Sequence, residues 1–242
     1  MLRLIRAETF RLVRKRSLYI YFAALVVAFA VLAYVRSGGF TATSVVDDAL
    51  TMFGLLPALA GGVTFAAVYT DDLSSRGLIT LVGFGVSKTK IVLAKFSLTL
   101  VLTTIVYGLA PLVHAAVYAL LGWPASAATW GILYAASAKF ALLTVLFTAL
   151  AGIVVYGLQR PTFAVVAYVL LAFGVVSGLV ATALGAFAPG LADFLATGIT
   201  DRVFTALTSG GAPTWPMIEY GVYLLVAMTL AVVAFHKKEM EF

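Results

Sequence analysis

Cysteine is absent from the 242 residues, which excludes disulfides and thiol catalysis and leaves the redox compartment undetermined. Histidine occurs only at His114 and His236, so we expect no metal site built from His and Cys ligands. Charged residues are scarce, at 11% of the chain against about 25% in soluble domains. Hydrophobic residues make up 63%, which is more than a soluble domain of this length could bury. Together these values indicate an integral membrane protein.

Catalytic motifs are missing as well. No nucleophile elbow, HExxH or other catalytic constellation occurs, so we predict no catalytic residues. The segment GFGVSKT looks like a phosphate-binding loop, but GxxxxGK[ST] requires glycine where this chain has Val82 and Ser87. We therefore predict that the chain does not hydrolyse ATP itself and holds no cofactor. Residues 1–16 lack the apolar core and cleavage site of a secretory signal, so we expect the first span to be retained.

Six apolar runs are each long enough for the ~20 helical residues that cross a bilayer. They predict an all-α integral membrane protein whose six transmembrane helices follow an interfacial helix at residues 1–16. The transmembrane domain then covers residues 17–242. At residues 188–215, apolar and polar residues recur at helical spacing between APG and SGGAP breakers, which predicts short external helices before the last span. The predicted spans are residues 18–35, 49–69, 91–121, 131–156, 162–187 and 216–235.

Basic residues are distributed unequally between the two sides of a six-span threading. Of the 16 Lys and Arg residues, 13 fall on the side that holds the termini, and the opposite loops hold only Arg36 and Arg202. The positive-inside rule therefore predicts a multi-pass protein of the cell membrane with both termini cytoplasmic. This topology, rather than nucleic-acid binding, accounts for the net charge of +6. The 13 residues are Arg3, Arg6, Arg11, Arg14, Lys15, Arg16, Arg76, Lys88, Lys90, Lys95, Arg160, Lys237 and Lys238.

The first 16 residues predict an amphipathic helix on the cytoplasmic surface of the bilayer. At about 100° per residue, apolar and basic side chains fall on different arcs of the helix. The basic arc would face anionic headgroups, and the alternative is an anchor that serves topology alone. The apolar arc holds Leu2, Ile5, Thr9, Leu12 and Val13, and the basic residues outside it are Arg3, Arg6, Arg11, Arg14 and Lys15.

The only long cytoplasmic loop carries the most informative segment, YTDDLSSRGLITLVGFGVSKTKIVLAKF at residues 69–96. It combines two acidic residues, a helix-like LSSRGLITL, a GFG break and a Ser-Lys-Thr-Lys run that leads into the third span. This order resembles the membrane subunits of type-2 ABC exporters, the ABC-2 permease family. The layout of the whole chain, from the basic interfacial helix to the external helices before the last span, resembles that family too. The matching positions are Asp72, Arg76, Gly77, Leu81, Ser87, Lys88, Ala94 and Lys95.

The resemblance implies a coupling helix at about residues 71–81, within a coupling loop at residues 70–90, that docks in a groove of a separate ATPase. Two copies of that ATPase would bind ATP and Mg, and a second permease subunit, identical or homologous, would complete the complex. Taken alone, the segment could instead be a solvated basic loop that satisfies topology. The residues expected to couple to the ATPase are Asp71, Asp72, Arg76, Gly77, Leu78, Thr80, Leu81, Ser87 and Lys88.

Besides Lys95, counted above with the cytoplasmic basic residues, three ionisable residues fall inside predicted spans, where burial in lipid is unfavourable and a function or a partner is expected. Lys139 and Glu219 are candidates for a translocation path, as a pair that lines a polar cavity open to the outside. The alternatives for them are a structural ion pair or side chains that reach to the interface. His114 is the third candidate, and its simplest role is a hydrogen bond to a helix carbonyl freed by Pro111.

Gly174 and Gly178 form a GxxxG motif in the fifth predicted span, which lets a second helix approach closely. The motif is interpreted either as packing inside the bundle or as a dimer interface. The second interpretation follows from the resemblance, which implies that two permease subunits meet through their first and fifth spans.

The resulting hypothesis is the permease subunit of an ATP-driven exporter that moves an amphipathic or hydrophobic substrate out of the cell. In its small size the chain resembles the permeases of antimicrobial-peptide export and self-immunity systems. Drugs or lipids are also compatible substrates. Three alternatives come from other classes: an ion-coupled secondary transporter, an intramembrane enzyme, and a membrane anchor or sensor subunit that transports nothing.

Overall fold

The computed structural model describes residues 2–37, 45–70, 73, 77–120, 122, 126–185, 198–210 and 212–238. All regular structure in these residues is helical, which confirms the predicted all-α membrane fold. The helices are α1 (Leu2–Val13), α2 (Arg16–Ser37), α3 (Val45–Leu56), η1 (Pro57–Gly61), α4 (Gly62–Phe65), η2 (Ala66–Thr70), α6 (Gly77–Gly83), α7 (Lys88–Leu120), α8 (Ala127–Leu158), α9 (Pro161–Ala172), α10 (Val175–Gly185), α12 (Ile199–Thr208) and α13 (Thr214–Lys237).

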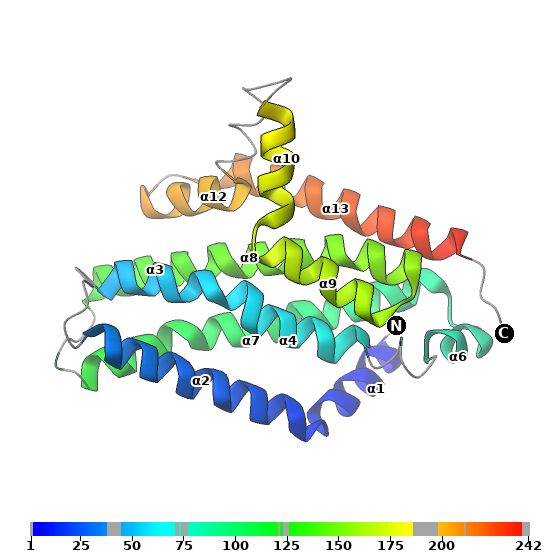
Figure 1. The fold of residues 1–242 in the computed structure, drawn as a ribbon, viewed down its shortest axis with the longest axis horizontal. Coiled ribbons are helices and arrows are strands. Elements are labelled where there is room, and N and C mark those ends of the chain that lie inside the picture. Colours follow the sequence, from blue (N-terminus) through cyan, green and yellow to red (C-terminus); the bar gives the residue numbers. More distant parts are fainter. Residues whose placement is uncertain are drawn as a thin grey trace.

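Among the described residues, five segments are long and apolar enough to cross a membrane, and the bent pair Pro161–Ala172 and Val175–Ala183 makes a sixth if it is one span. Helix α1 and the C-terminal end of α13 lie at the same end of the bundle (Figure 1). We call this the terminal end and the opposite one the distal end. The five segments are Arg16–Val35, Val45–Thr70, Lys88–Leu120, Ala127–Leu158 and Thr214–Lys237.

The fifth predicted span is not one straight helix. Its two parts, α9 and α10, meet at an angle of 67°, and α10 projects away from the bundle in Figure 1. The break falls at Gly174, which has a left-handed φ of 72° that glycine adopts without steric strain. With 12 residues α9 rises about 18 Å, less than the ~30 Å hydrocarbon core. The span predicted at residues 162–187 is therefore bent, and it counts as a sixth span if α9 and α10 cross the membrane together.

The second span is irregular in a way that its apolar composition does not predict. It runs from α3 through η1, α4 and η2, so that two π-helical turns interrupt the α-helix. The first π turn begins at Pro57, whose carbonyl accepts a hydrogen bond of 2.7 Å from the hydroxyl of Tyr168 on α9. Gly61 leaves room for that hydroxyl, because a Cβ there would overlap it and would lie 2.8 Å from Cγ2 of Thr144. The second span and α9 are thus joined at this turn.

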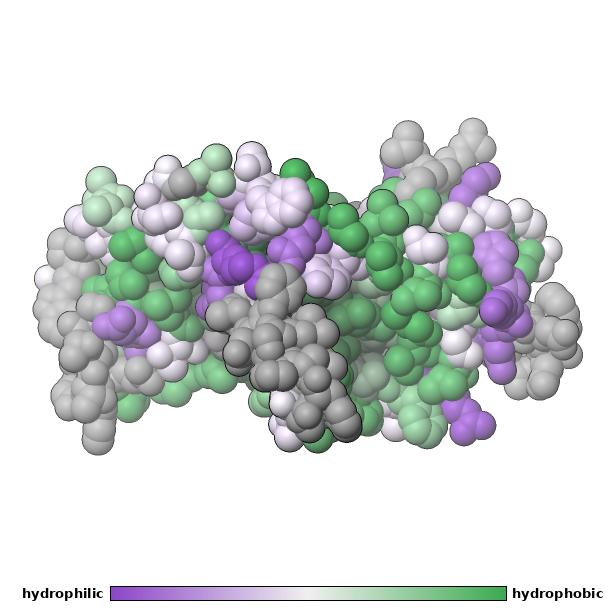
Figure 2. Space-filling model, turned by 90° about the horizontal axis from the view of Figure 1, so that it is seen from above, coloured by the Kyte–Doolittle hydropathy of each residue, from purple (hydrophilic) through white to green (hydrophobic). Residues whose placement is uncertain are grey.

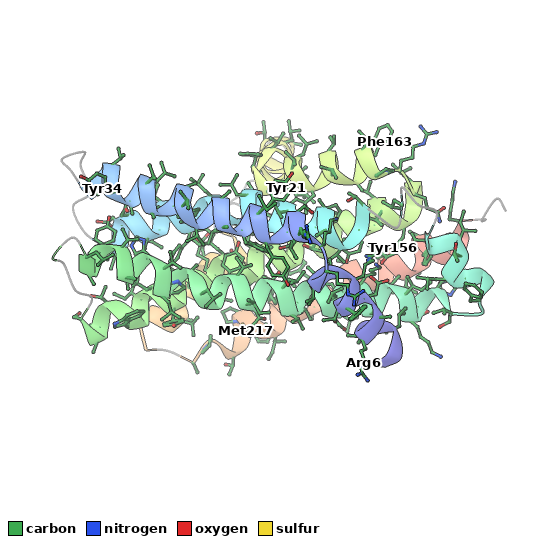
Figure 3. All side chains as sticks on the ribbon, turned by 90° about the horizontal axis from the view of Figure 1, so that it is seen from below. Arg6, Tyr21, Tyr34, Tyr156, Phe163 and Met217 are labelled. Atoms are coloured by element: carbon green, nitrogen blue, oxygen red, sulfur yellow. The ribbon has the colours of Figure 1, made fainter. Side chains whose placement is uncertain are left out.

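Helix α8 lies at the centre of the bundle and contacts α3, α7, α9, α12 and α13. Helix α2 is peripheral, and much of its apolar surface is exposed, including Tyr21 and Tyr34, which Figure 3 labels. Figure 2 looks onto the face that carries α12 and α13. Hydrophobic side chains cover much of the stretch between a hydrophilic group near its middle and hydrophilic side chains at the terminal end. This stretch of the face is suited to contact with lipid.

Candidate functional site

The predicted coupling loop lies at the terminal end, where α6 lies between the second span and α7 (Figure 1). The described part of the predicted helix begins at Gly77 and continues to Gly83, two residues beyond the expected end. A turn at Phe84 and Gly85 follows, and Gly85 has a φ of 79°. Of the predicted coupling residues, Asp71, Asp72 and Arg76 lie outside the described residues.

The two faces of α6 differ in what they contact. Leu78 is buried in the core cluster at the terminal end, and Leu81 packs against the same cluster. Thr80 is exposed, and the side chain of Phe84 is 82% exposed. An aromatic side chain this exposed, in the turn directly after a helix that Leu78 fixes to the bundle, is suited to fill a pocket on a partner. The sequence marks Phe84 only as the centre of a GFG break, so its exposure was not predicted.

Lys88, at the first position of α7, ties the loop to the end of the last span. Its ammonium donates hydrogen bonds to the carbonyls of Phe235 (2.8 Å), His236 (3.4 Å) and Lys238 (2.9 Å). A cation is favourable at these carbonyls because the helix dipole places partial negative charge at the C-terminal end. Ser87, just before it, is exposed. Lys88 therefore connects α6 and α7 to α13, which the sequence did not predict.

Lys95 is the second buried connection from α7. In the sequence it belongs to the basic residues of the cytoplasmic side, but the structure buries its side chain. Its ammonium lies 2.8 Å from Oε2 of Glu8 on α1 and donates a bond of 3.2 Å to the carbonyl of Val68 on η2. Arg11 lies 2.9 Å from the same Glu8 oxygen. Helix α1 is therefore held to α7 by the Lys95–Glu8 ion pair, and the same ammonium bonds a backbone carbonyl of the second span.

Lys139 and Glu219 do not form the pair that the sequence predicts. Lys139 pairs with Asp201, and Glu219 accepts a hydrogen bond of 2.7 Å from Arg202. Asp201 and Arg202 are neighbours on α12, so this helix provides a partner of opposite charge to both spans. The pairing prediction was wrong because α12 contacts both α8 and α13 and presents a partner of opposite charge to each residue.

We expect Asp201→Asn combined with Glu219→Gln to loosen α12 from the bundle. Partly exposed ion pairs contribute up to about 1 kcal/mol each, so a total of about 1 kcal/mol would raise the open population about fivefold. The measurement is the rate at which maleimide labels Val203→Cys, a site that is buried in the folded chain. The exposed site Thr205→Cys is the control, and its labelling rate should not change. Equal rates at Val203 in both backgrounds would contradict the docking role of the two pairs.

His114 also has a different partner from the one predicted. Its Nε2 lies 3.1 Å from the carbonyl of Val45 at the start of α3, not from a carbonyl freed by Pro111 on its own helix. Asp48 is fully buried nearby and accepts a hydrogen bond of 2.6 Å from the hydroxyl of Tyr118. The rings of His114 and Tyr118 are in contact, with centroids 4.7 Å apart. These groups join the second and third spans near the distal end.

Asp48 was missed because the predicted span starts at Ala49, which assigns the aspartate to a loop. The structure begins α3 four residues earlier, at Val45. Within the described residues, no group of three or more His, Asp or Glu could hold a metal ion.

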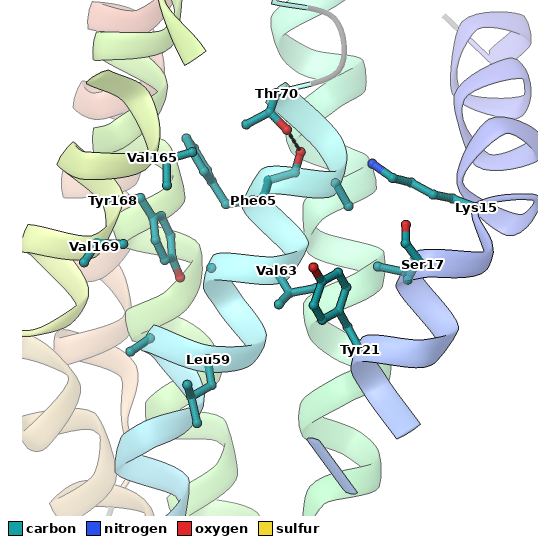
Figure 4. A pocket seen from close by; sticks show the side chains of 15 residues that line it. Lys15, Ser17, Tyr21, Leu59, Val63, Phe65, Thr70, Val165, Tyr168 and Val169 are labelled. Carbon is teal, nitrogen blue, oxygen red and sulfur yellow. Dashed lines mark hydrogen bonds between the residues drawn. The ribbon is translucent and has the colours of Figure 1, made fainter. Parts of the chain in front are cut away.

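A groove of about 580 Å³ opens between α2, the second span and α9 (Figure 4). Its walls are mainly apolar, with Leu59, Val63 and Val169 among the lining residues. Polar groups from Lys15, Ser17 and Thr70 lie toward the terminal end of the groove. The described lining residues do not include His114, Lys139 or Glu219. The groove can hold a molecule with an extended apolar part and a polar end.

A family model described as ABC-2 family transporter protein matches residues 4–178, which covers α1 through the early part of α10. A search of curated proteins finds no match.

Proposed function

The chain belongs to the ABC-2 family of transporter membrane proteins, and we propose that it is the permease subunit of an ATP-driven exporter. It works with two copies of a separate ATPase, which bind ATP and Mg, and with a second permease subunit, identical or homologous. Both termini, and with them α6, lie on the cytoplasmic side. The substrate is an amphipathic or hydrophobic molecule such as an antimicrobial peptide, a drug or a lipid.

The observation that carries this proposal is the placement of α6. This short helix is anchored inward by Leu78 and exposes Phe84 at the end that holds the termini. A partner that pushes on α6 also pushes on α7, whose 33 residues run without interruption to the distal end. Through Lys88, the same movement reaches the C-terminal end of α13. The loop is therefore built to pass a rigid-body displacement to at least two spans.

The groove between α2, the second span and α9 supports the proposed substrate class. Apolar walls favour the apolar part of a substrate through the hydrophobic effect, and the polar end of the groove suits a headgroup or terminus. Exposed apolar surface on α2 and α10 is available for the second permease subunit. Gly178 faces open space on α10, and Gly174 lies at the break just before α10, where its carbonyl accepts a backbone hydrogen bond of 2.9 Å from Gly178. In this proposal Lys139 and Glu219 act by holding α12.

The test is to purify the tagged chain in mild detergent from its native membrane and to identify bound proteins by mass spectrometry. We expect a P-loop ATPase in stoichiometric amount, and ATP hydrolysis that depends on this partner. An unrelated tagged membrane protein purified in parallel controls for contaminants. Purification of the chain without an ATPase, with no hydrolysis in the membrane extract that depends on the chain, would overturn the proposal.

A further inference from the structure

Lys95 presents a physical problem that the proposed function does not explain. Its side chain is only 2% exposed, on the first turns of a membrane-spanning helix, among apolar neighbours such as Val92 and Leu98. Burying an ammonium group is unfavourable unless it is paired and its protons are bonded. A pair of apolar residues of similar volume could fill the same space with equal or better stability. The stability of the fold alone therefore does not account for the Lys95–Glu8 ion pair.

The partners of Lys95 come from two segments on either side of it. Glu8 lies on the interfacial helix, with Nζ and Oε2 separated by 2.8 Å. The Val68 carbonyl, at 3.2 Å, belongs to η2, which ends at Thr70, where the coupling loop begins. Lys95 itself lies seven residues after Lys88, about 10 Å along α7 from the point where that loop ends. One ammonium group thus joins both spans that flank the coupling loop to α1.

A second cation, besides Lys95, holds the carboxylate of Glu8, and this fixes the orientation of the carboxylate on α1. Arg11, one turn later on α1, lies 2.9 Å from the Glu8 oxygen that Lys95 also contacts. The apolar face of α1 adds Leu12 to the core cluster that contains Leu78 of α6. The opposite face of α1 is exposed, and Figure 3 shows Arg6 pointing away from the bundle. Hydrophobic contact presses α1 onto the bundle, and the charged groups determine its register.

We propose that Lys95 is a positioning residue of the coupling device, and this inference rests on the proposed function. Through Glu8 and the Val68 carbonyl, it holds α1, the last turn of the second span and the first turns of α7 as one rigid body. When the ATPase displaces α6, α1 moves with it. The interfacial helix is then a moving part of the transporter and not only an anchor in the lipid surface.

The test measures distances between pairs of spin labels, which the absence of native cysteine makes straightforward. One pair, at Thr9 and Lys90, reports on α1 relative to the start of α7. The second pair, at Thr9 and Arg160, reports on α1 relative to the turn between α8 and α9. Both are measured in the complex with the co-purified ATPase, without nucleotide and after trapping with ATP and vanadate. We expect the Thr9–Arg160 distance to shift on trapping and the Thr9–Lys90 distance to stay constant.

The variant that tests Lys95 is Glu8→Leu with Lys95→Met, which replaces both members of this ion pair by apolar groups, so that neither is left buried without the other. We expect it to fold and to bind the ATPase, to broaden the Thr9–Lys90 distribution and to lose the shift at Arg160. Lys95→Arg alone keeps a cation at this position, so it should retain part of the shift in the Thr9–Arg160 distance on trapping.

The matched control is Arg6→Gln, which removes a charge from the exposed face of α1 and should behave as the unmodified chain. The inference is overturned if the double variant keeps both the narrow distribution and the shift. A Thr9–Lys90 distance that changes on trapping in the unmodified complex would overturn it too, while ATPase binding would still support the proposed function. If no ATPase co-purifies, the proposed function fails, and the inference fails with it.

Discussion

The Phe84→Asp chain should lose its ATPase on purification. Phe84 is 82% exposed at the end of α6, and the fold gains little from a side chain that solvent surrounds. In the assembled complex the same ring would be desolvated in the ATPase groove, where a carboxylate could not replace it. Aromatic anchors at the centre of an interface commonly contribute about 2 kcal/mol or more, equivalent to about a 30-fold weaker Kd. The measurement is titration of the purified chain with the ATPase identified by co-purification.

The matched control for this prediction is Phe10→Asp. Phe10 is also an exposed phenylalanine, at 57%, and lies on α1 at the same end of the bundle. Because Phe10 lies outside the coupling loop, its replacement should leave the Kd for the ATPase within about twofold of the unmodified value. Phe84→Leu, which keeps an apolar anchor, should lie between the two. Unchanged affinity for Phe84→Asp would show that α6 docks through a different surface.

The long apolar runs were sufficient to predict most of the bundle. A span needs about 20 apolar residues whatever its neighbours are, so hydropathy alone located α2, the second span, α7, α8 and α13. The bend at Gly174 was not predictable in this way, because α9 and α10 are both apolar and only the backbone conformation separates them. The π turns after Pro57 were missed for a similar reason. The first of these turns is bonded at the Pro57 carbonyl by Tyr168, 111 residues later, a contact that hydropathy does not reveal.

The partners of the charged residues in the candidate site could not be predicted from the sequence. The cost of burying Lys139 and Glu219 correctly predicted that each needs a partner. It did not identify the partners, because Asp201 and Arg202 reach these positions only when α12 folds onto α8 and α13. Lys95 was placed with the basic residues at the membrane surface because it follows Lys88 and Lys90 closely. Its burial depends on α1, and the sequence does not show which face of α7 that helix covers.

Gly61→Ala should strongly destabilise the bundle, and the effect should depend on the hydroxyl of Tyr168. A Cβ at Gly61 would overlap that hydroxyl and lie 2.8 Å from Cγ2 of Thr144. Overpacking costs about 1–3 kcal/mol, and a buried carbonyl at Pro57 that loses its donor costs about 1–3 kcal/mol more. We therefore expect a loss of about 3 kcal/mol, measured by unfolding the purified chain in mixed micelles with increasing SDS.

The double variant Gly61→Ala with Tyr168→Phe distinguishes a steric clash with the Tyr168 hydroxyl from a general intolerance of position 61 to substitution. Tyr168→Phe alone removes the hydrogen bond to Pro57 and should cost about 1 kcal/mol. It also vacates the position that the new methyl group occupies, so the two changes together should cost less than their sum. Gly108→Ala is the control, because a Cβ at that glycine of α7 meets open space and alanine favours the helix. If the two losses of unfolding free energy are additive, Gly61 and Tyr168 act independently. The contact between them would then not contribute to joining the second span to α9.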